Sequence, residues 1–269
     1  MRIARHHAVR LLASAAVAAL LAMSVGGCTT TGEDTTGSIG SPSAPHSDAD
    51  WRRAAAVWGE RYRRDPADAE AAMNFARALR ATGERAQAAA VLEQAAIKHP
   101  YNKALLGDYG RALADAGDFS QALDVLSRAH TPDAPDWRVL NAQGAVLDQM
   151  GRHQDAQRHY ASALKIVPNE PSVLSNLGLS YALSKDLKRA EATLRRASVQ
   201  PGAEPKVRQN LALVVGLQGR FAEAEKIASA DLPPDEAQAN VSYLRQMIAQ
   251  QSYGKKHGRP QLPAPDAGS

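Results

Sequence analysis

The feature that most constrains the fold is a repeat with a period of 34 residues. Alanine fills one column at this spacing, at Ala88, Ala122, Ala156, Ala190 and Ala224. A second column, five residues earlier, holds Gly83, Gly117, Gly151 and Gly219, with Lys185 in the one remaining place. A third column contains only small residues, namely Ala76, Gly110, Gly144, Gly178 and Ala212. A fixed period of this length is typical of proteins built from stacked structural repeats.

The residue types in these columns indicate a pair of antiparallel helices in each repeat. Small residues at a helix crossing let two backbones approach to about 8–10 Å, and larger residues such as Leu92 and Tyr160 fill the space beside them. Glycine suits the tight turn between the two helices. Prolines such as Pro100 and Pro168 end the second helix, because the proline ring clashes with a preceding helical turn.

This pattern resembles the tetratricopeptide repeat. Five copies fit residues 69–233, and they start near Ala69, Lys103, Trp137, Pro171 and Pro205. The stretch "WRRAAAVWGERYRRDP" fits the second half of a further copy over residues 50–68, whereas the fifth copy departs from the pattern at Ala228 and Asp231. Stacked helix pairs share a continuous core, so we expect an all-α, right-handed solenoid.

The segment "PPDEAQANVSYLRQMIAQQ" is predicted to close the solenoid as a capping helix over residues 234–251. Pro234 suits the start of a helix, and an apolar stripe at helical spacing follows, at Ala237, Val241, Leu244 and Ile248. We expect Tyr243 and Met247 to join the core rather than to contact a partner. The polar residues 252–269 are predicted to be a disordered tail.

The stretch "LLASAAVAALLAMSVGGCTT", which begins at Leu11, indicates an export signal over residues 1–27. A membrane span needs about 20 apolar residues, but this run is shorter and is broken by two glycines. Arginines precede it and small residues lead into Cys28, as in a signal peptide. The letters "VGGC" resemble the lipobox of bacterial lipoproteins, which implies that Cys28 is lipidated and becomes the first mature residue. An ordinary signal peptide with a chance cysteine is the alternative.

Residues 28–49 are predicted to be a flexible tether from the lipidated Cys28, because Thr, Ser, Gly and Pro predominate and little can be buried. Residues 1–27 contain three arginines and no acidic residue, so their removal lowers the formal net charge from +4 to +1. A nucleic-acid partner is therefore not expected, since it requires a concentrated basic surface in the mature chain.

No residue pattern indicates catalysis. His153 and His159 are six residues apart, which places them on different faces of a helix rather than at metal-ligand spacing. The sequence has no phosphate-binding loop and no nucleophile elbow. We expect no enzymatic activity, no small-molecule substrate, no metal and no cofactor other than the covalent lipid on Cys28.

The predicted partner-binding surface is the concave groove, which the first helix of each tetratricopeptide repeat lines. Its residues here are Asn74, Arg77, Arg80, Arg111, Asn176, Leu179, Leu183, Asn210, Leu213 and Leu217. The asparagine amides can hold an extended peptide backbone, but they can equally tie neighbouring helices together. The capping helix can likewise cover some of the leucines. Met73 and Arg77 replace the lysine and asparagine of the chaperone-binding carboxylate clamp, which disfavours that partner.

The stretch "RQNLALVVGLQGRFAEAEKIASADLPPDEAQANVSYLRQM" (residues 208–247) resembles the end of the TadD lipoproteins of the tight-adherence (Flp) pilus system. The resemblance implies an outer-membrane lipoprotein that faces the periplasm and binds the pilus secretin or another assembly subunit, as pilotins do. Thr29 after the cysteine fits the outer membrane, because inner-membrane retention commonly uses aspartate there. A periplasmic adaptor that recruits cell-wall enzymes is the alternative.

Overall fold

The computed structural model describes residues 47–257 of the chain, with side chains over residues 47–250. The predicted signal peptide (1–27), Cys28, most of the predicted tether and the last part of the predicted tail lie outside the described residues. Within the described part all regular elements are α-helices, and the only β-type contact is one isolated bridge between Thr131 and Ala134. The all-α repeat fold expected from the 34-residue period is confirmed.

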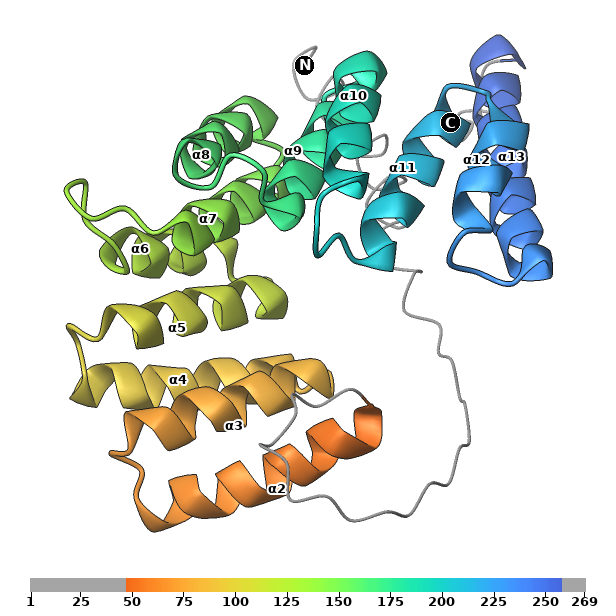
Figure 1. Ribbon diagram of the computed structural model, residues 1–269. Coiled ribbons are helices and arrows are strands. Elements are labelled where there is room, and N and C mark those ends of the chain that lie inside the picture. Colours follow the sequence, from red (N-terminus) through yellow and green to blue (C-terminus); the bar gives the residue numbers. More distant parts are fainter. Residues whose placement is uncertain (1–46, 258–269) are drawn as a thin grey trace, which may run out of the picture. The chain divides into compact units, whose positions relative to one another are not determined.

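The helices divide into two compact units that meet in sequence between Ile166 and Val167. The first unit contains α2 (Asp48–Arg64), α3 (Ala69–Ala81), α4 (Arg85–Lys98), α5 (Lys103–Ala116), α6 (Phe119–Arg128), α7 (Trp137–Gln149) and α8 (His153–Ile166). The second unit contains α9 (Pro171–Leu183), α10 (Leu187–Ser198), α11 (Pro205–Leu217), α12 (Phe221–Ala228) and α13 (Pro234–His257). Figure 1 shows the order of the helices within each unit.

In the first unit, α3, α5 and α7 each pack against the helix that follows, as expected for tetratricopeptide repeats (Figure 1). The crossings depend on glycine. A Cβ atom on Gly110 would lie 2.5 Å from Leu126 Cγ, and one on Gly144 would lie 2.5 Å from Tyr160 Cε1. No side chain fits in that space, so the third column of the period allows the two helices of a repeat to touch.

The second unit uses the same crossing. A Cβ atom on Gly178 of α9 would lie 2.6 Å from Leu194 Cγ of α10. The helix α13 is packed closely too, since a Cβ on Gly216 would lie 2.5 Å from Leu244 Cδ2. Val241 of α13 is buried in one core cluster with residues of α10, α11 and α12, so the last helix completes the core of this unit.

The turns between paired helices explain the glycine column. Gly83, Gly117, Gly151 and Gly219 all have positive φ angles, between 75° and 95°. Lys185 occupies the same place between α9 and α10 and is the one non-glycine residue of the described chain with positive φ, at 68°. A left-handed conformation costs an L-residue roughly 1–2 kcal/mol, which the packing of α9 on α10 must offset.

Helix starts follow from short polar side chains before the first turn. The backbone N–H of Ala71 donates to the Asp68 carboxylate at 3.0 Å, and that of Leu105 donates to the Asn102 side chain at 3.1 Å. These bonds satisfy amides that have no partner inside the helix. Proline begins α9 and α11, where its missing N–H has no cost.

Three details differ from expectation. The helix α2 already begins at Asp48, inside the predicted tether, because Ser47 and Asp50 form a reciprocal capping box. The helix α13 continues to His257, past the predicted end at residue 251. Ala237, Val241 and Leu244 are buried as expected, but the prediction that Tyr243 joins the core is wrong, since 46% of its surface is exposed on the outer face of α13.

Candidate protein-binding surface

In the first unit the predicted groove residues on α3 and α5 form a ladder of ion pairs. Arg111 donates to the carboxylate of Asp108 at 2.5 Å, and a guanidinium nitrogen of Arg77 lies 3.7 Å from the same carboxylate. Arg80 donates to Asp115 at 2.6 Å, which links α3 to α5. These contacts bring three arginines and two carboxylates of neighbouring repeats together, so the carboxylates offset most of the positive charge of this part of the surface.

Of the three arginines on this surface, Arg77 is the most accessible to a partner. Its side chain is 55% exposed, whereas Arg111 and Arg80 are 31% and 25% exposed and each has a shorter bond to a carboxylate. Arg77 also donates to the amide oxygen of Asn74 at 3.1 Å. That bond occupies the acceptor of the asparagine that was predicted to hold a peptide backbone.

In the second unit the equivalent positions are apolar. Leu179 and Leu183 on α9 and Leu213 and Leu217 on α11 are all half-buried, so each leaves part of its surface accessible. Asn176 on α9 is also half-buried. Covering apolar surface of this kind stabilises a complex by roughly 25 cal/mol for each Å² removed from water.

Asn210 is a correction to the predicted groove. Its side chain is only 7% exposed, and its amide nitrogen donates to the hydroxyl oxygen of Ser175 at 3.0 Å. This bond ties α11 to α9 inside the second unit. The alternative noted for the amides, that they join neighbouring helices, therefore describes Asn210, because a ligand could reach it only if a buried hydrogen bond were broken.

Two partners of the predicted groove residues were missed from the sequence. Asp115 pairs with Arg80, and Ser175 pairs with Asn210. In both cases the two residues are 35 positions apart, one repeat plus one residue. A search for complementary side chains at that separation would have found them.

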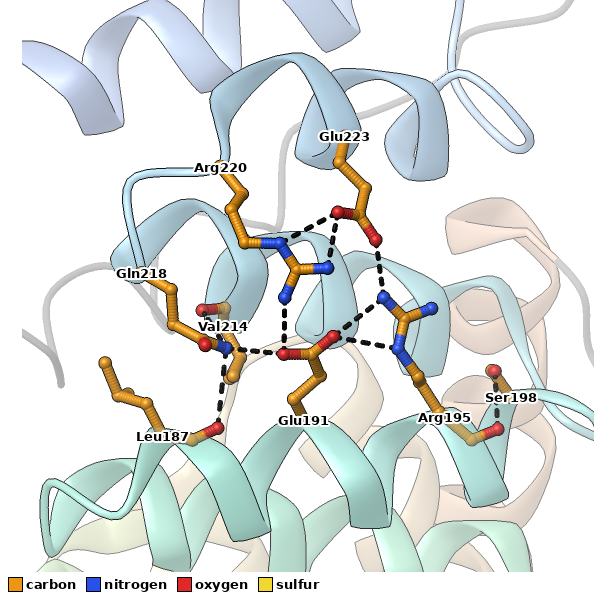
Figure 2. A network of polar contacts seen from close by, with 8 residues as sticks. All are labelled: Leu187, Glu191, Arg195, Ser198, Val214, Gln218, Arg220 and Glu223. Atoms are coloured by element: carbon orange, nitrogen blue, oxygen red, sulfur yellow. Dashed lines mark hydrogen bonds and ion pairs between the residues drawn. The ribbon is translucent and has the colours of Figure 1, made fainter.

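A polar network joins α10 to the turn between α11 and α12 (Figure 2). The carboxylate of Glu191 accepts hydrogen bonds from Arg220 at 2.7 Å, Gln218 at 2.8 Å and Arg195 at 2.9 Å. Glu223 accepts from both arginines and closes the network. Burial raises the pKa of Glu191, but the hydrogen bonds from Arg220, Gln218 and Arg195 outweigh it and lower that pKa to about 2. The network stabilises the junction between two repeats.

The histidines do not form a metal site. Within residues 47–250 no group of three or more His, Cys, Asp or Glu side chains is placed to hold an ion. A hydrogen bond of 2.8 Å joins Nδ1 of His153 and Oδ1 of Asp148. Burial lowers the pKa of His159, and the nearby His130 lowers it further.

None of the described helices has the length and the apolar character needed to cross a membrane.

The fold and this surface define a helical repeat protein whose exposed concave positions vary while its crossings stay the same. Models of the tetratricopeptide repeat match residues 79–145 and residues 141–205. The chain therefore contains tetratricopeptide repeats, as the 34-residue period predicts. No curated protein matches the sequence.

Solved structures show the same fold. PilW, a widely conserved type IV pilus biogenesis factor, is 18% identical with a TM-score of 0.61, over 72% of this chain and 91% of that chain. A tetratricopeptide repeat protein from Parabacteroides merdae is 17% identical with a TM-score of 0.58, over 77% and 82% of the two chains. A chain of the APC/C hetero-tetramer Cut9–Hcn1 is 14% identical with a TM-score of 0.61, over 77% of this chain but only 40% of that chain.

These similarities establish the fold and the general role. Tetratricopeptide repeats typically act as scaffolds for protein–protein interactions rather than as enzymes. The same fold serves many unrelated partners, so the chemistry of the exposed side chains has to identify which kind of partner this chain binds.

Proposed function

We propose that this protein is a non-enzymatic, lipid-anchored scaffold of the outer membrane that faces the periplasm and assists the assembly of a tight-adherence (Flp) pilus secretion machine. The proposal rests on the tetratricopeptide repeats, on the lipobox-like "VGGC" at Cys28 and on the TadD-like sequence of residues 208–247. The proposal is also supported by PilW, a pilus biogenesis factor that has the same fold.

The observation that carries the partner-binding role is the apolar surface on α9 and α11. Leu179, Leu183, Leu213 and Leu217 occupy predicted groove positions, are half-buried and come from two successive repeats. An apolar segment of a secretin or another assembly subunit can cover these side chains. This arrangement is typical of a groove that takes up a peptide or a helix by its apolar side chains.

The anchor and the groove act together in this mechanism. A lipid on Cys28 confines the protein to a membrane surface, residues 29–47 provide reach, and the leucines capture the partner. Confinement raises the local concentration of the captured subunit without any stronger contact. An adaptor that recruits cell-wall enzymes needs the same two parts and is the second candidate.

The test is deletion of the gene, followed by measurement of secretin multimers in the outer membrane and of assembled pili. We expect both to be lost and to be restored by the wild-type gene. Leu179→Asp combined with Leu213→Asp should fail to restore them, whereas Val199→Asp, at a residue that is 77% exposed at the end of α10, should restore them fully. Normal multimers and normal pili in the deletion strain would exclude the assembly role and favour the adaptor.

The anchor is tested separately with Cys28→Ala. Radiolabelled palmitate should label the wild-type protein and not the variant, and the variant should move from the membrane fraction to the periplasmic fraction. Equal labelling of the two proteins would show that Cys28 is not the lipidated residue.

A further inference from the structure

Within residues 47–257, α2 is the second helix of a repeat without a first helix beside it. In complete repeats such a helix packs against the first helix of its own repeat, as α4 packs on α3 and α6 packs on α5. Among the described residues α2 packs against α3 alone, which belongs to the next repeat (Figure 1). One face of α2 therefore lacks the neighbour that the repeat provides everywhere else.

The side chains on this face are those that a first helix would bury. Counting by the period of 34, Trp58 corresponds to Leu92, Leu126, Tyr160 and Leu194, which are at most 1% exposed. Trp58 itself is only half-buried, and the Arg61 guanidinium lies over it at 5.2 Å from the ring centroid. Ala54 likewise corresponds to the alanine column, whose four neighbours from Ala88 to Ala190 have no exposed surface, yet Ala54 is half-buried.

The open face extends over the whole helix. Trp51, Ala54, Trp58 and Arg61 follow one another at spacings of three and four residues, so they lie along one side of α2. Trp51 is half-buried like Trp58, and the neighbouring Val57 is 67% exposed. Two indoles on either side of a small residue provide a large apolar area with a shallow centre, which is the shape that accepts another helix.

The residues immediately before α2 are poorly suited to fill this place. The stretch "TTGSIGSPSAPH" contains two glycines and two prolines, which oppose a helix long enough to cover α2. A second chain can supply a helix for this place.

The sequence of α2 is complementary to itself in the antiparallel direction. Acidic residues lie in its first turn, at Asp48 and Asp50, and basic residues lie in its last turn, at Arg61, Arg63 and Arg64. Asp50, Arg61, Arg63 and Arg64 each have an ion-pair partner within the subunit. Two antiparallel copies still place the acidic start of each beside the basic end of the other, which also opposes their helix dipoles favourably. A crossing centred at Ala54 and Ala55 places Trp51 opposite Trp58 of the partner subunit.

We propose that the exposed face of α2 binds α2 of a second copy of this chain, forming a symmetric dimer in which each helix occupies the place of the other's missing first helix. The alanines form the close crossing, and the four tryptophans fill the space on both sides of it. This inference goes beyond the proposed function, because it concerns the pairing of two scaffolds and not the capture of a partner. A dimer carries two grooves and two lipid anchors, and both increase avidity at a membrane surface.

Disulfide trapping tests the pairing directly, because Cys28 is the only cysteine in the chain. In a full-length Cys28→Ala background, Ala54→Cys should form a covalent dimer under mild oxidation, since two residues at a close crossing satisfy the separation of about 7 Å or less between Cα atoms that a disulfide needs. Ala56→Cys, on the opposite side of α2, is the matched control and should remain monomeric. Equal crosslinking of the two variants would overturn the proposal.

Sedimentation equilibrium of the Cys28→Ala chain provides the second measurement. We expect twice the monomer mass, and Trp58→Glu should raise the dimer dissociation constant at least tenfold, while Val199→Glu leaves it unchanged. Circular dichroism establishes that Trp58→Glu keeps its helices. A chain that stays monomeric well above micromolar concentration overturns the proposal. If the part of the tryptophan fluorescence that Trp58→Phe removes from that monomer is shielded from acrylamide, a segment of the same chain covers α2 instead.

Discussion

The predicted groove residues of the two units differ in chemistry although they occupy the same positions of the repeat. One column at the 34-residue period reads Arg77, Arg111, Ala145, Leu179 and Leu213. In the first unit the arginines of this column are paired with Asp108, whereas in the second unit leucines expose apolar surface. The fold requires neither, because both types of side chain are tolerated at one backbone position. Residues that the fold leaves variable therefore set the chemistry of this surface.

The helix crossings behave in the opposite way, since both units need a small residue there. A Cβ atom added to Gly110 would lie 2.5 Å from the opposing helix, and one added to Gly178 would lie 2.6 Å from it. Any difference in stability between the units should thus come from their polar contacts and not from the crossings.

Gly110→Val and Gly178→Val should each lower the free energy of unfolding by about 3 kcal/mol, because the new side chain would overlap a buried leucine of the paired helix. Urea denaturation followed by circular dichroism measures both. Ala76→Gly, at the equivalent position of the first repeat, is the control and should cost only about 1 kcal/mol. A large difference between the two valine variants would show that the crossings are not equivalent.

Glu191→Gln should destabilise the second unit by about 1–2 kcal/mol, a value reduced by the solvent exposure of the two arginines that bind Glu191. The folded pKa of about 2 lies below the ordinary value of 4.5. The carboxylate therefore stabilises the folded state above pH 4.5, and this contribution is lost as the pH falls towards 2. Thermal unfolding between pH 2 and pH 6 should show a smaller pH dependence for the variant. Identical pH profiles would exclude a stabilising network.

His159 should give the first unit a pH dependence in a different range. Burial and the nearby His130 lower the pKa of His159 below the ordinary value of 6.5. Its neutral form is favoured in the folded state, so stability is complete above pH 6.5 and falls as the pH decreases below it. The effect should be smaller than that of Glu191→Gln. Replacement by His159→Gln should flatten the profile of thermal unfolding between pH 7 and pH 5, and an unchanged profile would contradict this origin.

The ion pair between Arg80 and Asp115 should contribute least. Its side chains are 25% and 38% exposed, so a double-mutant cycle with Arg80→Ala and Asp115→Ala should give a coupling energy of about 0.5 kcal/mol. The coupling should fall when the salt concentration is raised to 1 M, because the charges are then screened. A coupling above about 1.5 kcal/mol would mean that the charged face contributes to the fold as well as to the surface.

The positions of the helices could be predicted because one physical pattern recurs five times. The first helices begin at the residues expected from the period, including Ala69, Trp137 and Pro205. Most repeats contain the same crossing, turn and end, so an error in one copy is corrected by the others.

The details that failed lie where the repetition stops. Tyr243 is on the last helix, which has no counterpart earlier in the chain to show which side faces the core. Asn210 has the residue type expected of a ligand contact, and only the position of Ser175 on the neighbouring helix shows that it is buried. The capping box at Ser47 depends on two residues within a polar stretch that otherwise has the composition of a tether.

The connection between α6 and α7 is longer than the other turns of the first unit, and residues 131–135 within it are all exposed. This connection is therefore a suitable site for cleaving the chain or attaching a label with little loss of stability. A protease site inserted there should be cut in the native protein, and a fluorophore attached at Asp133 should report the position of the scaffold in a living cell without disturbing any helix pair.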